Sequence, residues 1–434
     1  SFSRRRLAWL LRRPRHQFAM RVLISGAGIA GPSLAWFLAK AGARVTIVEK
    51  APELLSHGQN VDIQGSARAL IKKMGLLKEY KRLNTTETGT QFIDSNGRPF
   101  ARFPVNRGKS ISPTSEFEIL RGDLAKILYA ATKDNSAIDY VFGTTVEKVL
   151  ENDEKRVKVQ FSTGKVDQYD LLVAADGQWS RLRKQCFPAD SVQVVDKGMF
   201  AVYWTAPRIP EDNNWWNIYQ APRSRVIAVR PDPHGTIRPM FAFMPRTKVQ
   251  KDAWTAASRG SREVQQDLLR KEFADAGWHA ERFLSTVDKA PDFYFQAIQQ
   301  IRMSKWSNSR VVCLGDTAYA PTPLTGAGTS LAIVGAYVLA GEISTLKDGQ
   351  YPQQALDAYE AKFRPFVEKT QYIPWFVPGI AHPDTLWKRW LFQSFVSLAS
   401  RIAALPFLVD RFDAGNAEDF PLPRYPVFED AADA

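Results

Sequence analysis

The chain has 434 residues, of which 45% are hydrophobic and 24% are charged, and its formal net charge is +13. This composition excludes a disordered chain, and the length suits two domains or one large domain with an insertion. The two cysteines, Cys186 and Cys313, exclude a disulfide framework and lack metal-ligand spacing. No apolar stretch is long enough to cross a membrane. We therefore expect a cytoplasmic globular protein without a bound metal.

Residues 1–19 form a basic N-terminal extension with six arginines and no acidic residue. The segment resembles an organellar transit peptide, and organellar targeting would follow if these residues are native. The interpretation we favour is that Met20, which stands directly before the first predicted strand, lies close to the natural start. A basic balance can also indicate nucleic-acid binding. The body of the chain has no basic run interleaved with aromatic residues, so we expect no nucleic-acid partner.

The first predicted elements are a strand over residues 21–25, a helix over 29–41 and a second parallel strand over 44–49. The turn between strand and helix has the pattern G-x-G-x-x-G, because it consists of Gly26, Ala27, Gly28, Ile29, Ala30 and Gly31. These glycines permit a tight turn, close approach of a pyrophosphate and close packing of helix on strand. Glu49, followed by Lys50, ends the second strand, where a carboxylate can accept hydrogen bonds from a ribose.

Further along the chain, apolar periodicity predicts helices over 121–133 and 328–344 and strands over 139–142, 157–161, 170–174 and 310–314. Two of these strands end in an acidic motif, with Asp176 before Gly177 in the first and Asp316 after Gly315 in the second. Each carboxylate can bind a ribose or ribityl hydroxyl. The helix that begins between Gly326 and Gly328 can stabilise negative charge at its N-terminus. The glycine turn alone does not distinguish FAD from a nicotinamide cofactor.

Two regions of different character interrupt the nucleotide-binding pattern. Asn96-Gly97 between alternating runs predicts a hairpin over residues 91–103, and the aromatic and β-branched run over 199–244 predicts an antiparallel sheet. Near the end of the chain, large apolar residues recur at helical spacing from Trp387 to Leu405, with lysine and arginine between them. We expect this amphipathic helix to pack across both domains. Contact with a membrane surface is the alternative.

Together and in this order, the glycine turn, the Asp-Gly motif and the Gly-Asp motif resemble the class A flavoprotein monooxygenases of the para-hydroxybenzoate hydroxylase fold. Residues 58–75 and the tail helix look most like the tetracycline-inactivating enzymes and related enzymes of microbial secondary metabolism. The resemblance implies an α/β fold with a Rossmann-like FAD-binding domain, whose mostly parallel sheet is interrupted twice, and a largely antiparallel substrate domain. We assign 20–88, 108–190 and 300–371 to the FAD-binding domain, 89–107 and 191–299 to the substrate domain, and 372–434 to a C-terminal bridging helix and tail.

The resemblance also implies the activity. FAD would be bound, NADPH or NADH would reduce it transiently, and O2 would give a C4a-hydroperoxyflavin that hydroxylates or epoxidises a hydrophobic aromatic or polycyclic metabolite. The cofactor carries this chemistry, while the protein positions the substrate and excludes water. The sequence points to no catalytic side chain. A flavin-dependent dehydrogenase or reductase without oxygen insertion is the main alternative, and a nicotinamide-only dehydrogenase and a non-catalytic flavin-binding partner protein are others.

The resemblance assigns roles to individual residues. Glu49 would hold the adenosine ribose, Arg121 and Asp316 the ribityl and phosphate region, and Asp62 would lie near the flavin ring. Asp176 would support the flavin and nicotinamide sites. The pocket for a hydrophobic substrate would draw on Gln64, Tyr203, Trp216, Phe241, Phe243, Met244, Pro321 and Pro323, although ordinary core packing is the alternative for each aromatic residue.

This sequence departs from the family pattern at three positions. Tyr319 stands where a histidine commonly follows the Gly-Asp motif, and Ala327 stands where a glutamine usually separates the two helix-start glycines. We expect both to lie near the flavin ring. Leu55 stands where close relatives often place an arginine for NADPH, which leaves the nicotinamide contact and the choice between NADPH and NADH open.

Overall fold

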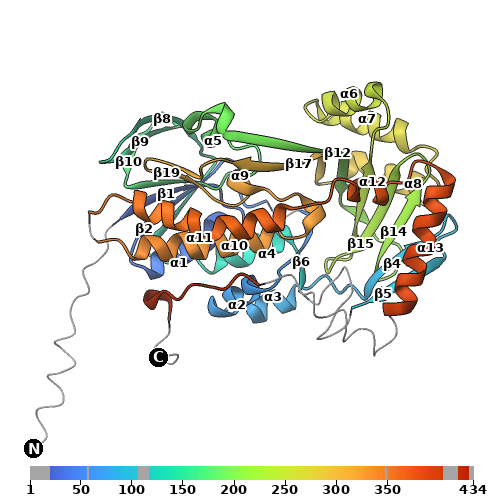
Figure 1. Cartoon of the computed structure of the whole chain (residues 1–434), viewed down its shortest axis with the longest axis horizontal. Coiled ribbons are helices and arrows are strands. Elements are labelled where there is room, and N and C mark those ends of the chain that lie inside the picture. Colours follow the sequence, from blue (N-terminus) through green and yellow to red (C-terminus); the bar gives the residue numbers. More distant parts are fainter. Residues whose placement is uncertain (1–19, 56–57, 106–116, 348, 404–418, 430–434) are drawn as a thin grey trace, which may run out of the picture.

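The first strand, helix and second strand form where the sequence predicts them. In the computed structural model they are β1 (Arg21–Ser25), α1 (Ala30–Lys40) and β2 (Arg44–Glu49). The structure describes residues 20–55, 58–105, 117–347, 349–403 and 419–429 (Figure 1). The basic extension over residues 1–19 and part of the predicted tail lie outside these ranges.

A six-stranded sheet with the order β18-β19-β11-β1-β2-β7 forms the centre of the nucleotide-binding region. Its strands from β19 to β7 pair in parallel, as expected for a Rossmann-like sheet, and only β18 pairs antiparallel at its edge. The strands not yet given are β7 (Ile138–Phe142), β11 (Leu171–Ala174), β18 (Ser307–Asn308) and β19 (Val311–Cys313). Because β1, β2, β11 and β19 run in one direction, the chain segments that follow them emerge at the same edge of the sheet.

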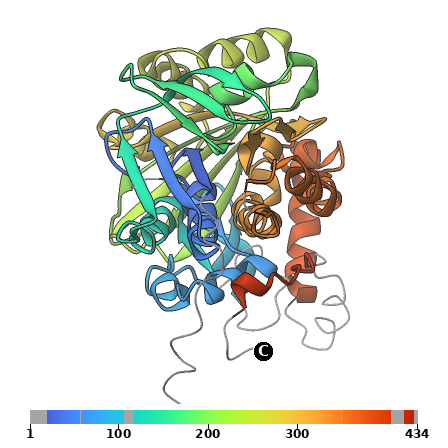
Figure 2. The same cartoon turned by 90° about the vertical axis from the view of Figure 1, so that its left-hand side faces the viewer.

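Helices and a small sheet cover the two faces of this parallel sheet (Figure 2). Helix α1 packs against α10 (Gly328–Ser344), which in turn packs against α11 (Gln353–Gln371). The small antiparallel sheet consists of β8 (Val146–Asn152), β9 (Val157–Phe161) and β10 (Val166–Tyr169). Its inward-facing residues Val157, Val159 and Phe161 join the same hydrophobic core as the helices. Helix α10 is apolar on nearly all of its sides, and neighbouring elements bury it along most of its length, as expected for a helix with this pattern.

Shorter elements connect this region to the second large sheet. Strands β3 (Asn60–Asp62) and β6 (Glu118–Leu120) pair antiparallel, and β6 runs directly into α4 (Arg121–Ala130). The remaining helices of the nucleotide-binding region are α2 (Ser66–Lys73), α3 (Leu77–Arg82), α5 (Arg181–Cys186) and the single turn α9 (Asp316–Tyr319). Short 3₁₀ turns occur at Ala189–Ser191, Val287–Lys289, Pro323–Thr325 and Pro426–Phe428.

The predicted antiparallel layer is an eight-stranded sheet with the order β17-β12-β16-β15-β14-β4-β5, and β13 pairs with β16 beside this path. Pairing is antiparallel except between β14 and β4, which are parallel. Its strands are β4 (Gly89–Ile93), β5 (Pro99–Pro104), β12 (Val192–Trp204), β13 (Ala206–Pro207), β14 (Trp215–Ala221), β15 (Arg225–Pro231), β16 (Thr236–Phe243) and β17 (Phe293–Met303). The hairpin predicted around Asn96 and Gly97 is the β4–β5 pair.

The two faces of this eight-stranded sheet have different neighbours. One face packs under α6 (Lys248–Ala257), α7 (Arg262–Phe273) and α8 (Ala280–Leu284), and these elements share a hydrophobic core. The opposite face carries Arg230, whose side chain reaches Glu118 of β6. That face is therefore turned toward the nucleotide-binding region.

The C-terminal helices are α12 (Val377–Ala381) and α13 (Leu386–Ala403). Helix α13 has the predicted location, but it packs on β5 and α12 at the outer edge of the eight-stranded sheet (Figure 1). Most of its large apolar residues are exposed, which corrects the expectation that they are packed between domains. None of the helices in the described ranges combines the length and the apolar character needed to cross a membrane.

Candidate cofactor and substrate site

The glycine turn after β1 leaves room for a ligand at one position only. A Cβ atom on Gly26, whose φ is +115°, would lie 2.4 Å from the carbonyl oxygen of Ala175, and one on Gly31 would lie 2.0 Å from that of Gly26. The first and third glycines are thus required by packing within the protein. A Cβ on Gly28 would have its nearest neighbour, the Arg121 guanidinium, 3.4 Å away. Only the second glycine opens onto space, which is the position where a dinucleotide pyrophosphate approaches the backbone.

Ile29 and Ala30 of the same turn have side chains buried in the core, and Ala30 begins helix α1. Glu49 at the end of β2 accepts hydrogen bonds from the backbone N–H groups of Ala27, at 2.9 Å, and Ala51, at 3.0 Å. Its carboxylate therefore lies against the glycine turn, within reach of a ribose bound there. The neighbouring Lys50 is exposed.

Asp316 and Arg121 place opposite charges beside the glycine turn. The Asp316 side chain is open to solvent, yet protein surrounds it on most sides, so it lies within a cleft. This burial raises the pKa of the Asp316 carboxyl, and the nearby charge of Arg121 acts in the opposite direction. A Cβ on Gly328, at the start of α10, would lie 3.7 Å from the Asp316 carboxylate, so the helix N-terminus adjoins it.

Asp62 and Gln64 reach the same helix start from another element. The Gln64 backbone N–H donates to the Ser330 hydroxyl at 2.9 Å, and its side-chain amide donates to Asp62 at 3.1 Å. The Gln64 amide nitrogen would lie 3.9 Å from a Cβ on Gly326. The structure therefore brings Asp62, Gln64, Gly326, Gly328 and Asp316 together, although they come from segments more than 250 residues apart.

Asp176 has a different environment from Asp316. Its carboxylate accepts a hydrogen bond from the Arg181 N–H at 3.1 Å at the start of α5, and its other oxygen is buried without a hydrogen-bond partner among the described residues. Burial raises the pKa of Asp176, while the hydrogen bond from Ser180 acts against this. The next residue, Gly177, donates to the Thr317 hydroxyl at 3.0 Å. This contact joins the Asp-Gly and Gly-Asp motifs directly.

The cleft-facing side of the eight-stranded sheet supplies aromatic and charged residues. Arg230 lies 3.6 Å from the ring centre of Trp216 and donates to Glu118 at 2.9 Å. Tyr203 lies on this face, because it pairs in register with Met240 and packs with the small core of that face. Tyr294 of β17 is close enough to Arg121 and Asp316 for their charges to act on its pKa, which burial raises. The sheet and the glycine turn therefore face each other across one cleft.

Glu87 and Glu118 form a pair of buried carboxyl groups beside the Arg230 guanidinium. The Glu87 side chain is 1% exposed, accepts from the Asn60 amide at 2.8 Å and lies 3.6 Å from the Arg230 guanidinium. Burial raises the pKa of Glu87 well above its ordinary value, Arg230 opposes this, and Glu118 adds to it. One cation thus serves two buried acids, which favours a proton on Glu87.

The predicted substrate-pocket residues separate into two groups. Gln64, Tyr203, Trp216 and Met244 lie on or beside the cleft-facing side. Phe241 and Phe243 are fully buried on the opposite side of the sheet, where Phe241 packs on Phe273 and Phe243 on Trp254. This placement contradicts the expectation that they line the pocket, since side chains alternate between faces along a strand. Pro321 is buried beside the start of α10, whereas Pro323 is exposed.

Tyr319 also faces away from the cleft, contrary to expectation. Its ring is buried against Trp306, with ring centres 4.7 Å apart, and its hydroxyl lies 3.0 Å from that of Tyr359. A Cβ on Gly335 of α10 would collide with this hydroxyl at 2.2 Å. Tyr319 is thus a packing residue between α9, α10 and α11. Ala327 immediately precedes α10, and Leu55 is exposed.

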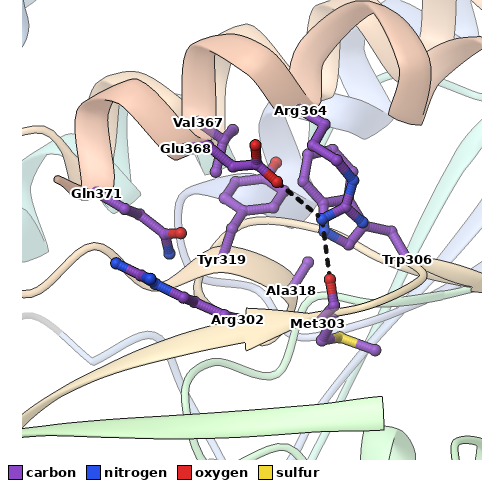
Figure 3. A pocket seen from close by; sticks show the side chains of 9 residues that line it. All are labelled: Arg302, Met303, Trp306, Ala318, Tyr319, Arg364, Val367, Glu368 and Gln371. Atoms are coloured by element: carbon purple, nitrogen blue, oxygen red, sulfur yellow. Dashed lines mark hydrogen bonds and ion pairs between the residues drawn. The ribbon is translucent and has the colours of Figure 1, made fainter.

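A cavity of about 220 Å³ lies on the other side of α9, between β17 and α11 (Figure 3). Arg364 crosses it and bonds to the Met303 carbonyl at 2.9 Å and to Glu368 at 3.5 Å, so its charge is already compensated. The volume is below the roughly 300–1,000 Å³ typical of small-molecule sites. Of the residues expected near the flavin or the substrate, Tyr319 lines it, and the glycine turn, Glu49, Asp62, Arg121, Asp176 and Asp316 do not. We therefore place the candidate site in the cleft and not in this cavity.

Sequence reasoning missed Arg230, Glu87, Glu118 and Tyr294. A local signal existed for two of them, because Arg230 and Glu118 each stand in a short apolar strand. A charged residue in such a strand needs a buried partner. The identity of that partner could not be found from the pattern, because Arg230 and Glu118 are separated by 112 residues.

The site combines a glycine turn with acidic strand ends at one edge of a parallel sheet. This edge faces the aromatic side of a second sheet. Such an arrangement defines a dinucleotide-binding protein with a substrate cleft. The FAD binding domain family matches residues 19–372. The FAD-dependent monooxygenase asL6 from Sarocladium schorii is 32% identical over 431 residues, covering 94% of this chain and 99% of that protein. The flavin-dependent monooxygenase eupH from Phoma sp is 36% identical, covering 80% of this chain and 84% of that protein.

Among solved structures, tetracycline destructase Tet(51) superposes with a TM-score of 0.75 at 27% identity, covering 94% of this chain and 99% of that one. The chain belongs to the FAD binding domain family and, within it, to the flavin-dependent monooxygenases. This confirms the predicted fold class, the enzyme class and the bound cofactor, FAD.

Proposed function

We propose that this enzyme uses a reduced nicotinamide and O2 to hydroxylate or epoxidise a hydrophobic aromatic or polycyclic metabolite. The observation that carries the proposal is the shared cleft. The open position at Gly28, the Arg121 guanidinium and the Asp316 carboxylate lie on one side, and Tyr203, Trp216 and Arg230 lie on the other. When bound, FAD supplies the redox chemistry and the activation of O2.

The residues around the cleft fit FAD. A Cβ at Gly28 would occupy the space that a pyrophosphate needs, and Arg121 beside it offers a positive charge to the phosphates. In the proposed arrangement Glu49 accepts hydrogen bonds from the ribose, and Asp316 accepts them from the ribityl chain. The N-terminus of α10 at Gly328 then faces the flavin ring, where its dipole favours negative charge.

The substrate side of the cleft has the chemistry for a flat, largely apolar molecule with a few polar groups. Trp216 and Tyr203 offer ring faces, and Arg230 offers N–H donors, although both its acidic neighbours compete for them. Gln64 offers an amide near the start of α10. The structural neighbour named as a tetracycline destructase supports a polycyclic substrate.

The first experiment is the visible absorption of the purified holoenzyme under anaerobic conditions. We expect a flavin spectrum that NADPH or NADH bleaches and air restores. A panel of polycyclic phenols, with tetracycline as one member, is then incubated under ¹⁸O2, and products are examined by mass spectrometry. Incorporation of one labelled oxygen atom supports the proposal. Nicotinamide oxidation without any labelled product would instead identify a flavin-dependent dehydrogenase or reductase without oxygen insertion.

The assignment of Asp316 to FAD is tested by Asp316→Ala. We expect the purified variant to lose most of its flavin absorption while its far-UV circular dichroism stays unchanged, because a hydrogen-bond acceptor for the ribityl chain is removed. Asp190→Ala, at an exposed aspartate in a 3₁₀ turn, is the matched control and should retain its flavin. Full flavin content in Asp316→Ala would contradict this role.

A further inference from the structure

Helix α13 presents its most apolar side to solvent. Trp387, Trp390, Leu391, Phe395 and Leu398 recur at i, i+3, i+4, i+8 and i+11, so they form one stripe along the helix. All five are exposed, with 68% of the surface accessible for both Trp390 and Phe395. At about 150–250 Å² for each large apolar side chain, the stripe exposes several hundred Å². An exposed patch of this size on a single helix marks a contact surface.

The inner side of α13 is the more polar one. Val396 and Ser400 are its buried residues, and the Ser397 hydroxyl donates to the Phe100 carbonyl of β5 at 3.3 Å. Phe392 adds an aromatic contact to Phe92, with ring centres 6.1 Å apart. The helix is therefore fixed to the β4–β5 hairpin through Phe392 and Ser397. Folding of the described chain leaves the outer stripe, which we call the α13 stripe, uncovered.

The charges on α13 indicate what covers the stripe. The helix carries Lys388, Arg389 and Arg401 and contains no acidic residue. Asp384, just before the helix, pairs with Lys388 at 2.8 Å, whereas Arg401 at the other end is exposed. Its cations lie toward both ends, and its exposed tryptophans lie in the first two turns. Tryptophan beside lysine or arginine on an amphipathic helix is typical of a helix that lies in the headgroup region of a bilayer. Anionic lipid adds an attraction to each cation near the surface.

A second copy of the chain fits the stripe less well. In a twofold antiparallel pair of α13 helices, Arg389 would oppose Arg401 of the other copy, and in a parallel pair Arg389 and Arg401 would each oppose the same residue of the other copy. Both arrangements place positive charges of the two copies close together, next to an apolar contact from which water is excluded. Lipid phosphates relieve this repulsion.

We propose that α13 is an interfacial anchor that places this enzyme on anionic membrane surfaces through the α13 stripe. The helix lies parallel to the surface, with Trp387, Trp390 and Phe395 among the headgroups and upper acyl chains. Lys388 and Arg401 remain at the phosphate level. The inference does not depend on the proposed reaction.

The test is sedimentation of the purified holoenzyme with phosphatidylcholine vesicles that contain or lack phosphatidylglycerol. We expect binding to the anionic vesicles, and a loss of about tenfold or more for the double variant Trp390→Ser/Phe395→Ser, because two large side chains no longer enter the bilayer. Arg401→Glu should weaken binding to the anionic vesicles by about fivefold or more. The matched control is Val249→Ser/Val264→Ser, which removes exposed apolar residues from α6 and α7 and should bind like the wild type.

Flavin absorption and the thermal midpoint, measured for each variant, show that folding is unchanged. Residues 1–19, with their six arginines, are present in every protein, so a binding difference between variants reports on α13. Absence of wild-type binding to anionic vesicles would overturn the proposal, as would equal binding by the double variant. Sedimentation velocity tests whether a second copy covers the stripe instead. A wild-type protein that is dimeric and does not bind vesicles, together with a monomeric double variant, would identify an interface between copies.

Discussion

The two faces of the eight-stranded sheet are built from the same strands but follow different physical rules. Under α6, α7 and α8 the sheet carries Phe241, Phe243 and Trp204, all fully buried in an aromatic core. On the cleft side the same strands carry Tyr203 and Arg230. Apolar burial stabilises the first face, whereas the second places charged and aromatic groups where a ligand can reach them.

This difference shows how one sheet combines stability with a site. Contacts on the helix-covered face are made to close-packed neighbours, so a loss of volume there is costly. Arg230 on the cleft face is the guanidinium beside two buried carboxyls, Glu87 and Glu118, and its charge offsets the free-energy cost of burying them. Substitutions on the two faces should therefore have different consequences.

The largest effect is expected for Phe241→Ala on the helix-covered face. The change removes a ring that packs on Trp204, Phe273 and Phe283, and the resulting cavity should lower the free energy of unfolding by about 3–5 kcal/mol. Chemical denaturation followed by circular dichroism measures it. Tyr203→Phe, at the neighbouring cleft-face position, is the control and should change stability by less than about 0.5 kcal/mol. A stable Phe241→Ala protein with altered substrate KM would place Phe241 in the pocket after all.

Arg230→Met on the cleft face should have the next largest effect. Removal of the guanidinium leaves Glu87 and Glu118 without their cation, which typically costs about 3–5 kcal/mol for a buried pair. Because Glu87 can take up a proton, we expect a loss of about 2 kcal/mol, larger at alkaline than at acidic pH. Thermal unfolding across pH measures it. The double variant Arg230→Met/Glu87→Gln should recover part of the loss, and an absence of recovery would show that the two residues are not coupled.

The smallest effect is expected for Glu87→Gln, and it should depend on pH. The folded protein raises the pKa of Glu87, so it holds this proton at pH values where the unfolded chain, with a pKa near 4.5, has released it. The contribution of Glu87 to stability is therefore full below about pH 4.5 and is lost as the pH rises through the folded-state pKa. Glutamine cannot ionise and avoids this loss. We expect equal stability near pH 4.5 and a gain of about 1 kcal/mol near pH 8.

The measurement for Glu87→Gln is the unfolding free energy at both pH values, with Glu53→Gln, at an exposed glutamate, as the control. The control should show no pH-dependent difference from the wild type. A Glu87→Gln protein that is less stable than the wild type near pH 8 would show that Glu87 is ionised and that its pairing with Arg230 is the dominant contribution.

The errors of sequence-based reasoning at the site share one cause. Phe241 and Phe243 were expected to line the pocket as aromatic residues of the substrate sheet, and Tyr319 was expected near the flavin ring from its position after the Gly-Asp motif. Their actual directions depend on strand register and on what packs against each face, as the pairing of Phe241 with Val202 and of Tyr203 with Met240 shows. Amphipathicity of α13 was evident from its spacing, but the direction of its apolar side was set by the β4–β5 hairpin on which it lies.

The sequence by itself determined the elements whose signals are local. The glycine turn, the helix it opens, the parallel strands and the Asn96-Gly97 hairpin follow from chain stereochemistry and apolar period, and they predict a Rossmann-like dinucleotide-binding fold. Only the tertiary structure decided which distant groups meet: Gln64 with Ser330, Glu118 with Arg230, and Gly177 with Thr317. These contacts join segments more than 100 residues apart, and no local pattern encodes them because burial, and not sequence separation, selects the partner of a buried polar group.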